Sequence, residues 1–304
     1  VVTAVGDIPA HVEFFENPED VAREKGKLAA AAPRTGFVIL NHDDYLAYDM
    51  KEKTKAPVLT YGLEERAEVR ISNYEIRIAK DIDAGDTPAG VSFKIDCKGS
   101  TVPMRLSGAL GIGAAYAAGA GAAVGIAMGM NMLEVSEALR EYAPPSGRMR
   151  LIRGIKHSVI LDDTYNASPA AVRAALETLR EAPGKRKIAV LGDVLEIGEY
   201  TEHAHRAIGV LAVQCADMIF CVGARAKFIA DEARLRGFDS SHVFIFDDSR
   251  SAGRALDPMI RAGDLILVKG SQGMRMEQAV EEIMVHPEDA SKLLVRQEAY
   301  WKNN

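Results

Sequence analysis

Five short apolar segments in the second half of the chain alternate with segments of helical periodicity, and this alternation limits the possible folds more than any other feature. Strands that are separated by helices are joined by crossovers, which place the strands parallel in one sheet. The sequence therefore predicts a Rossmann-like, doubly wound α/β unit, followed by a polar tail from about His286. The predicted strands are Ser158–Leu161, Lys187–Leu191, Met218–Val222, Val243–Phe246 and Leu265–Val268.

The first half has a βαβ order followed by two further strands. The expected elements are strands at Val1–Val5, 36–40 and 57–61, helices at about 17–32 and 43–53, antiparallel strands at 67–78 and 90–98, a glycine- and alanine-rich helix, and a helix at 132–142. Ala143-Pro144-Pro145-Ser146-Gly147 then interrupts the pattern with two prolines and a glycine. We expect the domain boundary there, with one α/β domain over 1–146 and a second over 147–304.

The glycine- and alanine-rich helix has to be weighed against a membrane span. No charged residue lies between Arg105 and Glu134, and Gly121, Gly125 and Gly129 follow the four-residue spacing of membrane helix pairs. However, the segment has few large apolar side chains, no flanking aromatic anchors and no basic bias. We expect a packed internal helix whose small residues let another backbone approach closely, and no membrane association.

Composition and charge exclude several functional classes. The chain has 304 residues, 48% of them hydrophobic and 26% charged, which is enough to bury a large core. A formal net charge of -6 argues against a dedicated nucleic-acid binder. The three cysteines lack metal-type spacing, so we expect free thiols in a reducing, cytoplasmic compartment. We also expect a monomer.

Glycine, acidic and lysine residues follow the predicted strands of the second half. Because the carboxyl ends of parallel strands meet at one edge of a sheet, these turns should converge where a phosphorylated or zwitterionic ligand can bind. Alternatively, each turn only caps the helix that follows it. The turns are Asp162-Asp163, Gly192-Asp193, Gly223, Asp247-Asp248 and Lys269-Gly270-Ser271.

Several of these turns lie in longer blocks that resemble the signature blocks of the Mur ligase family. They are Asp162-Asp163-Thr164-Tyr165-Asn166-Ala167-Ser168-Pro169, the block Val190 to Glu199, Leu267-Val268-Lys269-Gly270-Ser271, and upstream Ala10 to Phe15 with Ala22 to Lys27. The resemblance covers most of the chain. It implies a partial Mur ligase central domain followed by a Rossmann-like C-terminal domain.

The resemblance also implies a reaction. Members of the branch most similar to this chain use ATP and Mg²⁺ to phosphorylate the carboxylate of UDP-MurNAc-tripeptide. The amine of D-Ala-D-Ala then displaces phosphate from the acyl phosphate. Such chemistry needs cations that neutralise phosphate charge and a nucleotide clamp.

The resemblance assigns metal and catalytic roles to two upstream residues. His11 corresponds to a magnesium ligand, although this ion prefers oxygen, and Glu13 is a less certain contributor. Lys25 corresponds to a lysine that many Mur ligases carry as a carbamate, which orients magnesium. The alternatives are a surface histidine without a role and a solvated lysine in a charged run.

Nucleotide contacts are implied for four residues. Arg148 resembles the hinge arginine that reaches a phosphate of ATP. A guanidinium group, which is planar and permanently charged, suits that contact. Asp163 resembles the acidic residue that binds the ribose hydroxyls, and Tyr165 and Asn166 would lie near the adenine. Helix capping is the alternative for Asp163, and Asp162 is expected to shape the turn.

Substrate contacts are implied for the remaining turns. Lys269, in the family's Lys-Gly-Ser turn with Ser271, would face the substrate carboxylate or the reacting centre. Asp193, Glu196 and His205 would recognise the amino substrate or support the ATP site. The alternative for Lys269 is a buried lysine without a ligand.

The chain departs from the family in two places. It lacks a Gly-x-x-x-x-Gly-Lys-Ser/Thr phosphate loop, from which we expect an N-terminally truncated fragment without turnover of its own. Where the family has Gly-x-His-Asn-x-x-Asn, this chain has Gly108 to Ala114 without polar side chains. Two alternatives stay open. One is a relative that keeps the fold and uses another substrate, such as a folylpolyglutamate or cyanophycin synthetase, and the other, which the Gly108 to Ala114 departure motivates, is a non-catalytic nucleotide-binding protein.

Overall fold

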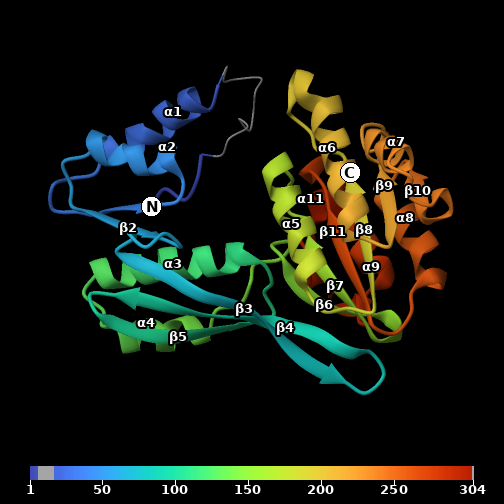
Figure 1. Ribbon diagram of the computed structural model, residues 1–304, viewed down its shortest axis with the longest axis horizontal. Helices are drawn as coiled ribbons and strands as arrows, with labels where there is room; N and C mark the ends of the chain where they lie inside the picture. Colours follow the sequence, from blue (N-terminus) through green and yellow to red (C-terminus); the bar gives the residue numbers. More distant parts are fainter. Residues whose placement is uncertain (6–16, 303–304) are drawn as a thin grey trace. The chain divides into compact units, whose positions relative to one another are not determined.

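A computed structural model describes residues 1–5 and 17–302 and divides by its internal contacts into two compact units (Figure 1). Unit 1 comprises Val1–Ile76, Val91–Ser107 and Ile112–Ala143, and unit 2 comprises Arg77–Gly90, Gly108–Gly111 and Pro144–Asn304. The last break lies inside the proline-rich linker. The sequence did not indicate that 77–90 and 108–111 pack with the second unit.

Unit 1 is built on a five-stranded sheet of order β1-β2-β3-β4-β5. Strands β1, β2 and β3 are parallel neighbours, whereas β3, β4 and β5 follow one another through short turns and therefore run antiparallel. The elements are α1 Pro18–Ala30, β1 Val38–Asn41, α2 Tyr45–Tyr48, β2 Val58–Gly62, β3 Val69–Asp81, β4 Gly85–Cys97, β5 Ser100–Ser107, α3 Ile112–Ala127 and α4 Met132–Arg140.

The strand expected at Val1–Val5 is wrong beyond a single residue. Only Val2 forms a bridge, which is parallel to Leu40. The next rung of the parallel ladder would join the amide of Asp43 to the carbonyl of Ala4, but side chains occupy both groups: the Asp43 amide donates to Asn41 Oδ1, and the Ala4 carbonyl accepts from Lys25 Nζ. These side-chain bonds replace the sheet ladder after Val2.

The glycine- and alanine-rich segment forms α3, which packs against β2 and α4. Within the described ranges, no helix is long and apolar enough to cross a membrane. A Cβ atom added at Gly119 would lie 2.7 Å from Ile71 Cδ1, so this position must stay small for the sheet to approach. The expectation of a closely packed internal helix agrees with these contacts.

Unit 2 contains a six-stranded sheet of order β10-β9-β8-β11-β7-β6, parallel except for β6. The predicted doubly wound α/β class is confirmed. The elements are β6 Arg150–Gly154, β7 Ser158–Asp163, α5 Pro169–Glu181, β8 Arg186–Gly192, α6 Thr201–Cys215, β9 Met218–Val222, α7 Lys227–Leu235, β10 Val243–Phe246, α8 Ser249–Leu256, β11 Asp264–Lys269, α9 Glu277–Ile283, α10 Ala290–Leu293 and α11 Ala299–Lys302.

The order of the strands creates a switch point at β11. Helices α5, α6 and α7 pack one against the next, and α8 packs against α9. Right-handed crossovers place the first group on one face of the sheet and the second on the other. Because β11 is inserted between β7 and β8, the helices that follow neighbouring strands leave in opposite directions there, which opens the carboxyl edge to a ligand.

Two strands were missed because neither has a continuous apolar run. β5 contains Pro103 and alternates exposed and buried residues. β6 carries Arg150 and Arg153 and lies at the edge of its sheet, antiparallel to β7. Edge strands tolerate both proline and charge, so the sequence signal is weak.

The packing of α3 can be tested with two alanine substitutions in the same helix. At Gly119, a buried position, the added methyl group collides with Ile71, so we expect Gly119→Ala to lower the unfolding free energy by about 1 kcal/mol despite the better helix propensity. Gly121 is exposed and its added Cβ would have only an ordinary contact, at 3.7 Å from Leu139 Cδ2. Gly121→Ala should therefore stabilise by about 0.5–1 kcal/mol. Thermal unfolding measures both, and equal gains would contradict the close packing.

Candidate functional site

The carboxyl ends of β7 and β11 hold a buried ion pair. Lys269 and Asp163 are register partners, and both are buried. Lys269 Nζ donates to Asp163 Oδ2 at 2.6 Å and to the carbonyl oxygen of Asn166 at 2.9 Å. The lysine predicted from the Lys-Gly-Ser turn and the acidic residue predicted from the preceding block are thus brought together.

Asp162 points into the protein and holds the backbone around it. Its Oδ2 accepts from the amide of Gly147, and its Oδ1 accepts from both the amide and the hydroxyl of Thr164. Complete burial raises the pKa of Asp162 to about 6, although these bonds oppose the rise. The residue therefore shapes the turn, as the sequence indicated.

The segment after the linker is tied to the same turn. Asp163 Oδ1 accepts from the amide of Met149, and the amide of Tyr165 donates to the carbonyl of Gly147. Gly147 has φ +67°, and a Cβ there would lie 2.7 Å from the Tyr165 nitrogen. The close approach thus requires glycine at this position.

Arg148 and Tyr165 form the outer side of this turn. The guanidinium carbon of Arg148 lies 4.0 Å from the centroid of the Tyr165 ring, and both side chains are exposed, as is Asn166. All four residues predicted to contact nucleotide therefore lie around the carboxyl end of β7. Their roles as ligand contacts stay predictions.

Helix capping does not explain Asp163. The N-cap of α5 is Ser168, whose hydroxyl accepts from the amide of Ala171 at 3.2 Å, with Pro169 following in the first turn. Both Asp163 carboxylate oxygens are instead engaged with Lys269 and Met149. The capping alternative is therefore excluded.

The turn after β8 is held by buried polar side chains. Asp193 Oδ1 accepts from the amides of Arg225 and Ala226, at the start of α7, at 3.0 and 2.7 Å. The Ser271 hydroxyl accepts from the amide of Leu195, so the turn after β11 is joined to the turn after β8.

His205 supports the same turn as a neutral ring. The amide of Val194 donates to Nε2, so Nδ1 carries the ring proton and donates to the carbonyl of Thr201. Burial lowers the pKa of His205, which favours this neutral form. The predicted substrate contacts of Asp193, His205 and Ser271 are not tested by these internal bonds. Glu196 is exposed, with φ +61°.

The predicted metal residues are only partly described. His11 and Glu13 lie outside the described residues. Lys25 is exposed on α1, in unit 1, and its ammonium group donates to the carbonyl of Ala4 at 2.8 Å. An ammonium group cannot ligate a cation, so magnesium binding by Lys25 requires the carbamylated form and loss of this bond.

The apolar segment Gly108–Gly111 has a structural role in unit 2. The amide of Leu110 donates to the carbonyl of Met149, and the amide of Leu151 donates to the carbonyl of Gly108. Gly108 and Gly111 both have positive φ, of 74° and 84°. The segment thus extends the edge of the sheet beside β6, immediately before α3 begins.

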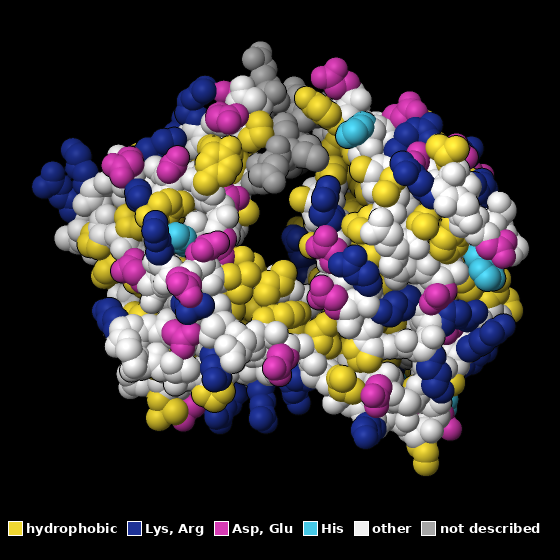
Figure 2. All heavy atoms as spheres, in the orientation of Figure 1, with side chains coloured by type: hydrophobic (Ala, Val, Ile, Leu, Met, Phe, Trp, Pro, Cys, Tyr) yellow, Lys and Arg dark blue, Asp and Glu magenta, His cyan; other side chains and the backbone are white. Residues whose placement is uncertain are grey.

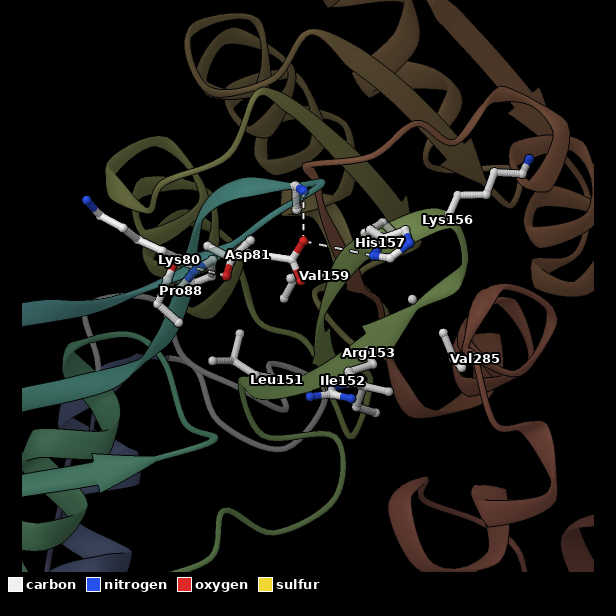
Figure 3. Close-up of a pocket in the computed structure, with 15 residues that line it drawn as sticks. Lys80, Asp81, Pro88, Leu151, Ile152, Arg153, Lys156, His157, Val159 and Val285 are labelled. Carbon is white, nitrogen blue, oxygen red and sulfur yellow. Dashed lines mark hydrogen bonds and ion pairs between the residues drawn. The ribbon is translucent and has the colours of Figure 1, made fainter.

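A cavity of about 700 Å³ lies at the opposite end of β7 (Figure 3). It is lined by the adjoining ends of β3 and β4, by β6 and by the start of β7, and Figure 3 shows His157 pointing toward Asp81. The separation between His157 Nδ1 and Asp81 Oδ1 is 3.9 Å. None of the predicted site residues in the described chain lines this cavity, and we assign the ligand edge from the buried charges at the carboxyl ends instead.

Charges of both signs are interspersed over most of the face drawn in Figure 2, which accords with a chain of net charge -6.

Among the polar groups near β7, the sequence missed Arg296 and Glu277, which are both buried. Glu277 lies in a segment with an ordinary helical pattern, and Arg296 lies in the polar tail. The only available signal was the apolar run Leu293-Leu294-Val295 directly before Arg296.

Sequence comparison finds two domain matches. The Mur ligase middle domain matches residues 1–118, and the Mur ligase, glutamate ligase domain matches residues 147–272. UDP-N-acetylmuramoyl-tripeptide–D-alanyl-D-alanine ligase from Bacillus subtilis (strain 168) is 28% identical over 292 residues, which cover 94% of this chain and 59% of that protein. The enzyme of the same name from Mycobacterium leprae is 29% identical, with 94% and 58% covered.

Structural comparison finds the same architecture in solved proteins. MurF from Thermotoga maritima, in complex with ADP, superposes with a TM-score of 0.74 at 23% identity, covering 91% of this chain and 59% of that one. MurF from Acinetobacter baumannii gives a TM-score of 0.75 at 24% identity, with 91% and 58% covered. These likenesses confirm the predicted fold. The chain spans less than three fifths of the length of each of these relatives.

The raised pKa of Asp162 predicts a pH dependence of stability. Between its ordinary pKa of 3.8 and about 6, the folded protein holds a proton that the unfolded chain releases, so this group lowers the unfolding free energy as pH rises, by up to about 3 kcal/mol. Asp162→Asn removes the titration. We therefore expect its unfolding free energy, relative to the unmodified protein, to increase from pH 4 to pH 7 in denaturant titrations.

Asp248 provides a control of opposite sign. Its pKa is lowered, chiefly by hydrogen bonds from Ser251, so it adds stability that is lost as pH falls. Relative to the unmodified protein, Asp248→Asn should lose unfolding free energy as pH rises through the acid range. A parallel pH dependence for the two variants would disprove the assignment for Asp162.

Proposed function

This chain belongs to the Mur ligase family, whose middle and C-terminal domains it matches, and from this premise we propose that it acts in an ATP-dependent amide-bond ligase of peptidoglycan precursor synthesis. The proposed acceptor is UDP-MurNAc-tripeptide and the proposed amine is D-Ala-D-Ala. The names of similar proteins support this choice, since several relatives that align with at least 89% of this chain are named UDP-N-acetylmuramoyl-tripeptide–D-alanyl-D-alanine ligase.

The observation that carries the proposal is the buried Lys269–Asp163 pair at the switch point, with Arg148 and Tyr165 exposed beside it. The pair joins the ends of β7 and β11 at 2.6 Å and fixes the turn that carries Tyr165 and Asn166. Arg148 lies exposed against the Tyr165 ring. An exposed guanidinium group beside an aromatic ring suits an adenine nucleotide, whose phosphates and base it can contact.

The proposed reaction has two steps. A carboxylate oxygen of the tripeptide attacks the γ-phosphorus of ATP, which releases ADP and leaves an acyl phosphate. The amine of D-Ala-D-Ala then attacks the acyl carbon, loses a proton and expels inorganic phosphate. Magnesium would neutralise phosphate charge, and we propose His11 and carbamylated Lys25 as residues that hold it.

A direct assay tests the substrate assignment. The complete reading frame that contains this chain should release phosphate from MgATP only when UDP-MurNAc-tripeptide and D-Ala-D-Ala are both present. Diaminopimelate is the informative competitor, because a relative from Geobacillus thermodenitrificans that is 25% identical over 274 residues is named for that amine. Glutamate tests the folylpolyglutamate-type alternative. Nucleotide binding without turnover for any amine would favour a non-catalytic protein.

Asp163 provides the mutational test of the nucleotide site. Asp163→Ala removes the partner of Lys269 and the acceptor proposed for ribose, so we expect the Kd for ATP to rise at least about tenfold in calorimetric titrations. Asp248→Ala is the matched control, because Asp248 also follows a strand of the same sheet and caps α8. The control should lose up to about 2 kcal/mol of stability and keep its affinity. Unchanged affinity in Asp163→Ala would remove this turn from the nucleotide site.

A further inference from the structure

Two buried cations hold three successive backbone carbonyls at the end of β7. Arg296 donates through Nη1 and Nη2 to the carbonyl of Thr164, at 3.1 and 2.9 Å, and through Nη2 to the carbonyl of Tyr165, at 2.7 Å. Lys269 donates to the next carbonyl, that of Asn166, at 2.9 Å. We call Thr164–Asn166 the β7 turn.

These bonds take the place of the strand-to-strand hydrogen bonds that are missing once β7 has ended. The β7 turn lies beyond the last residue of β7, so its carbonyls have no ladder partner. A carbonyl that is buried without a donor costs about 1–3 kcal/mol, whereas a charged donor forms a stronger bond than a neutral one. The planar guanidinium group reaches two consecutive carbonyls at once, which fixes the orientation of both peptide planes.

Arg296 is itself held in place from α9. Its Nη1 donates to Glu277 Oε2 at 3.1 Å, and the side chains of both residues are at most 5% exposed. The second oxygen of Glu277 accepts from Arg275 Nε at 2.7 Å. The guanidinium group therefore has a fixed position in a charge-paired site, despite burial that lowers its pKa.

The β7 turn is the same segment that presents Tyr165 and Asn166 outward, beside Arg148. The carbonyls face the buried cations, while Tyr165 as a residue remains 45% exposed. Any rotation of the 164–165 or 165–166 peptide planes would move that ring and the Asn166 amide. The direction of the proposed nucleotide contacts thus depends on donors from the C-terminal end of the chain.

We propose that Arg296 is a positioning residue for the adenine nucleotide: it sets the conformation of the β7 turn and thereby the placement of Tyr165 and Asn166. The proposal rests on the function proposed above for the nucleotide site. Arg296 touches no ligand in this mechanism. The recognised ligand class is an adenine nucleotide, probed here with MgATP and MgADP.

The alternative is that Arg296 only stabilises unit 2, and the chain offers a matched control. Arg186 forms a two-bond ion pair with Asp264, at 3.0 and 2.7 Å, and also donates to the carbonyl of Met259. This pair lies at the first residues of β8 and β11, the opposite edge of the same sheet. Arg186→Ala should therefore destabilise unit 2 without reaching the β7 turn.

The experiment compares Arg296→Ala, Arg296→Lys and Arg186→Ala in the complete reading frame. Amide hydrogen exchange reports the β7 turn directly, calorimetry reports the Kd for MgATP and MgADP, and thermal unfolding reports stability. We expect Arg296→Ala to speed exchange at residues 164–167 and to raise both Kd values at least about tenfold. Arg296→Lys, which keeps the charge but loses the fork, should fall between, and millimolar guanidinium should partly restore nucleotide binding in Arg296→Ala. Arg186→Ala should lower the unfolding temperature and leave turn exchange and Kd unchanged.

The fluorescence emission of Trp301, the only tryptophan of the chain, distinguishes loss of the Arg296 hydrogen bonds from detachment of the C-terminal segment that carries Arg296. Trp301 lies 5.4 Å from the guanidinium carbon of Arg275, so its emission should change if the C-terminal segment detaches. Unchanged emission in Arg296→Lys, together with faster turn exchange, supports positioning. Unaltered exchange and Kd in folded Arg296→Ala or Arg296→Lys would overturn the proposal.

Failure of the proposed function gives a different result. If the unmodified protein binds no adenine nucleotide, the nucleotide assignment of the site fails, and with it the positioning of a nucleotide by Arg296. Hydrogen exchange then still decides whether Arg296 orders the β7 turn. Normal nucleotide binding in all variants would instead leave the proposed function intact and remove only the role of Arg296.

Discussion

The Lys269–Asp163 pair is the interaction on which the rest of the site depends. It exists because β11, the last strand in the sequence, is inserted between the first two parallel strands of its sheet. That insertion places a cation and a carboxylate from distant parts of the chain in register, 2.6 Å apart. A buried charge without its partner would be strongly unfavourable, so the pair also specifies how the ends of β7 and β11 meet.

Buried polar side chains around this pair serve the backbone first. Asp162 and Asp193 each accept from main-chain amides, and His205 bridges an amide and a carbonyl. The turns after β7, β8 and β11 are therefore fixed by side chains whose bonding capacity is largely used within the protein. A site of this kind is rigid before a ligand arrives, which lowers the entropy lost on binding.

The sequence predicted those parts of the structure that depend on local pattern. The parallel strands of unit 2 have short apolar runs, and the turns that follow them contain Asp163, Asp193 and Lys269 in recognisable blocks. It could not predict Arg296 beneath the β7 turn, because that contact joins residues 132 positions apart through a tail with no regular pattern. Likewise, β5 and β6 were missed because edge strands with proline and arginine lack an apolar run, and Val1–Val5 was overestimated because side chains take up its backbone groups.

The end of the β3–β4 hairpin belongs to unit 2, although the strands themselves are part of the sheet of unit 1. Lys185 donates to the carbonyl of Asp83. Gly263 lies so close to Ala84 that a Cβ added to Gly263 would be 2.7 Å from the carbonyl oxygen of Ala84. Recombination between two homologous genes at the proline-rich linker would consequently combine the hairpin of one protein with the surface around Lys185 and Gly263 of the other. Exchange of these units between homologues would preserve the fit only if the hairpin end and the surface around Gly263 are inherited together.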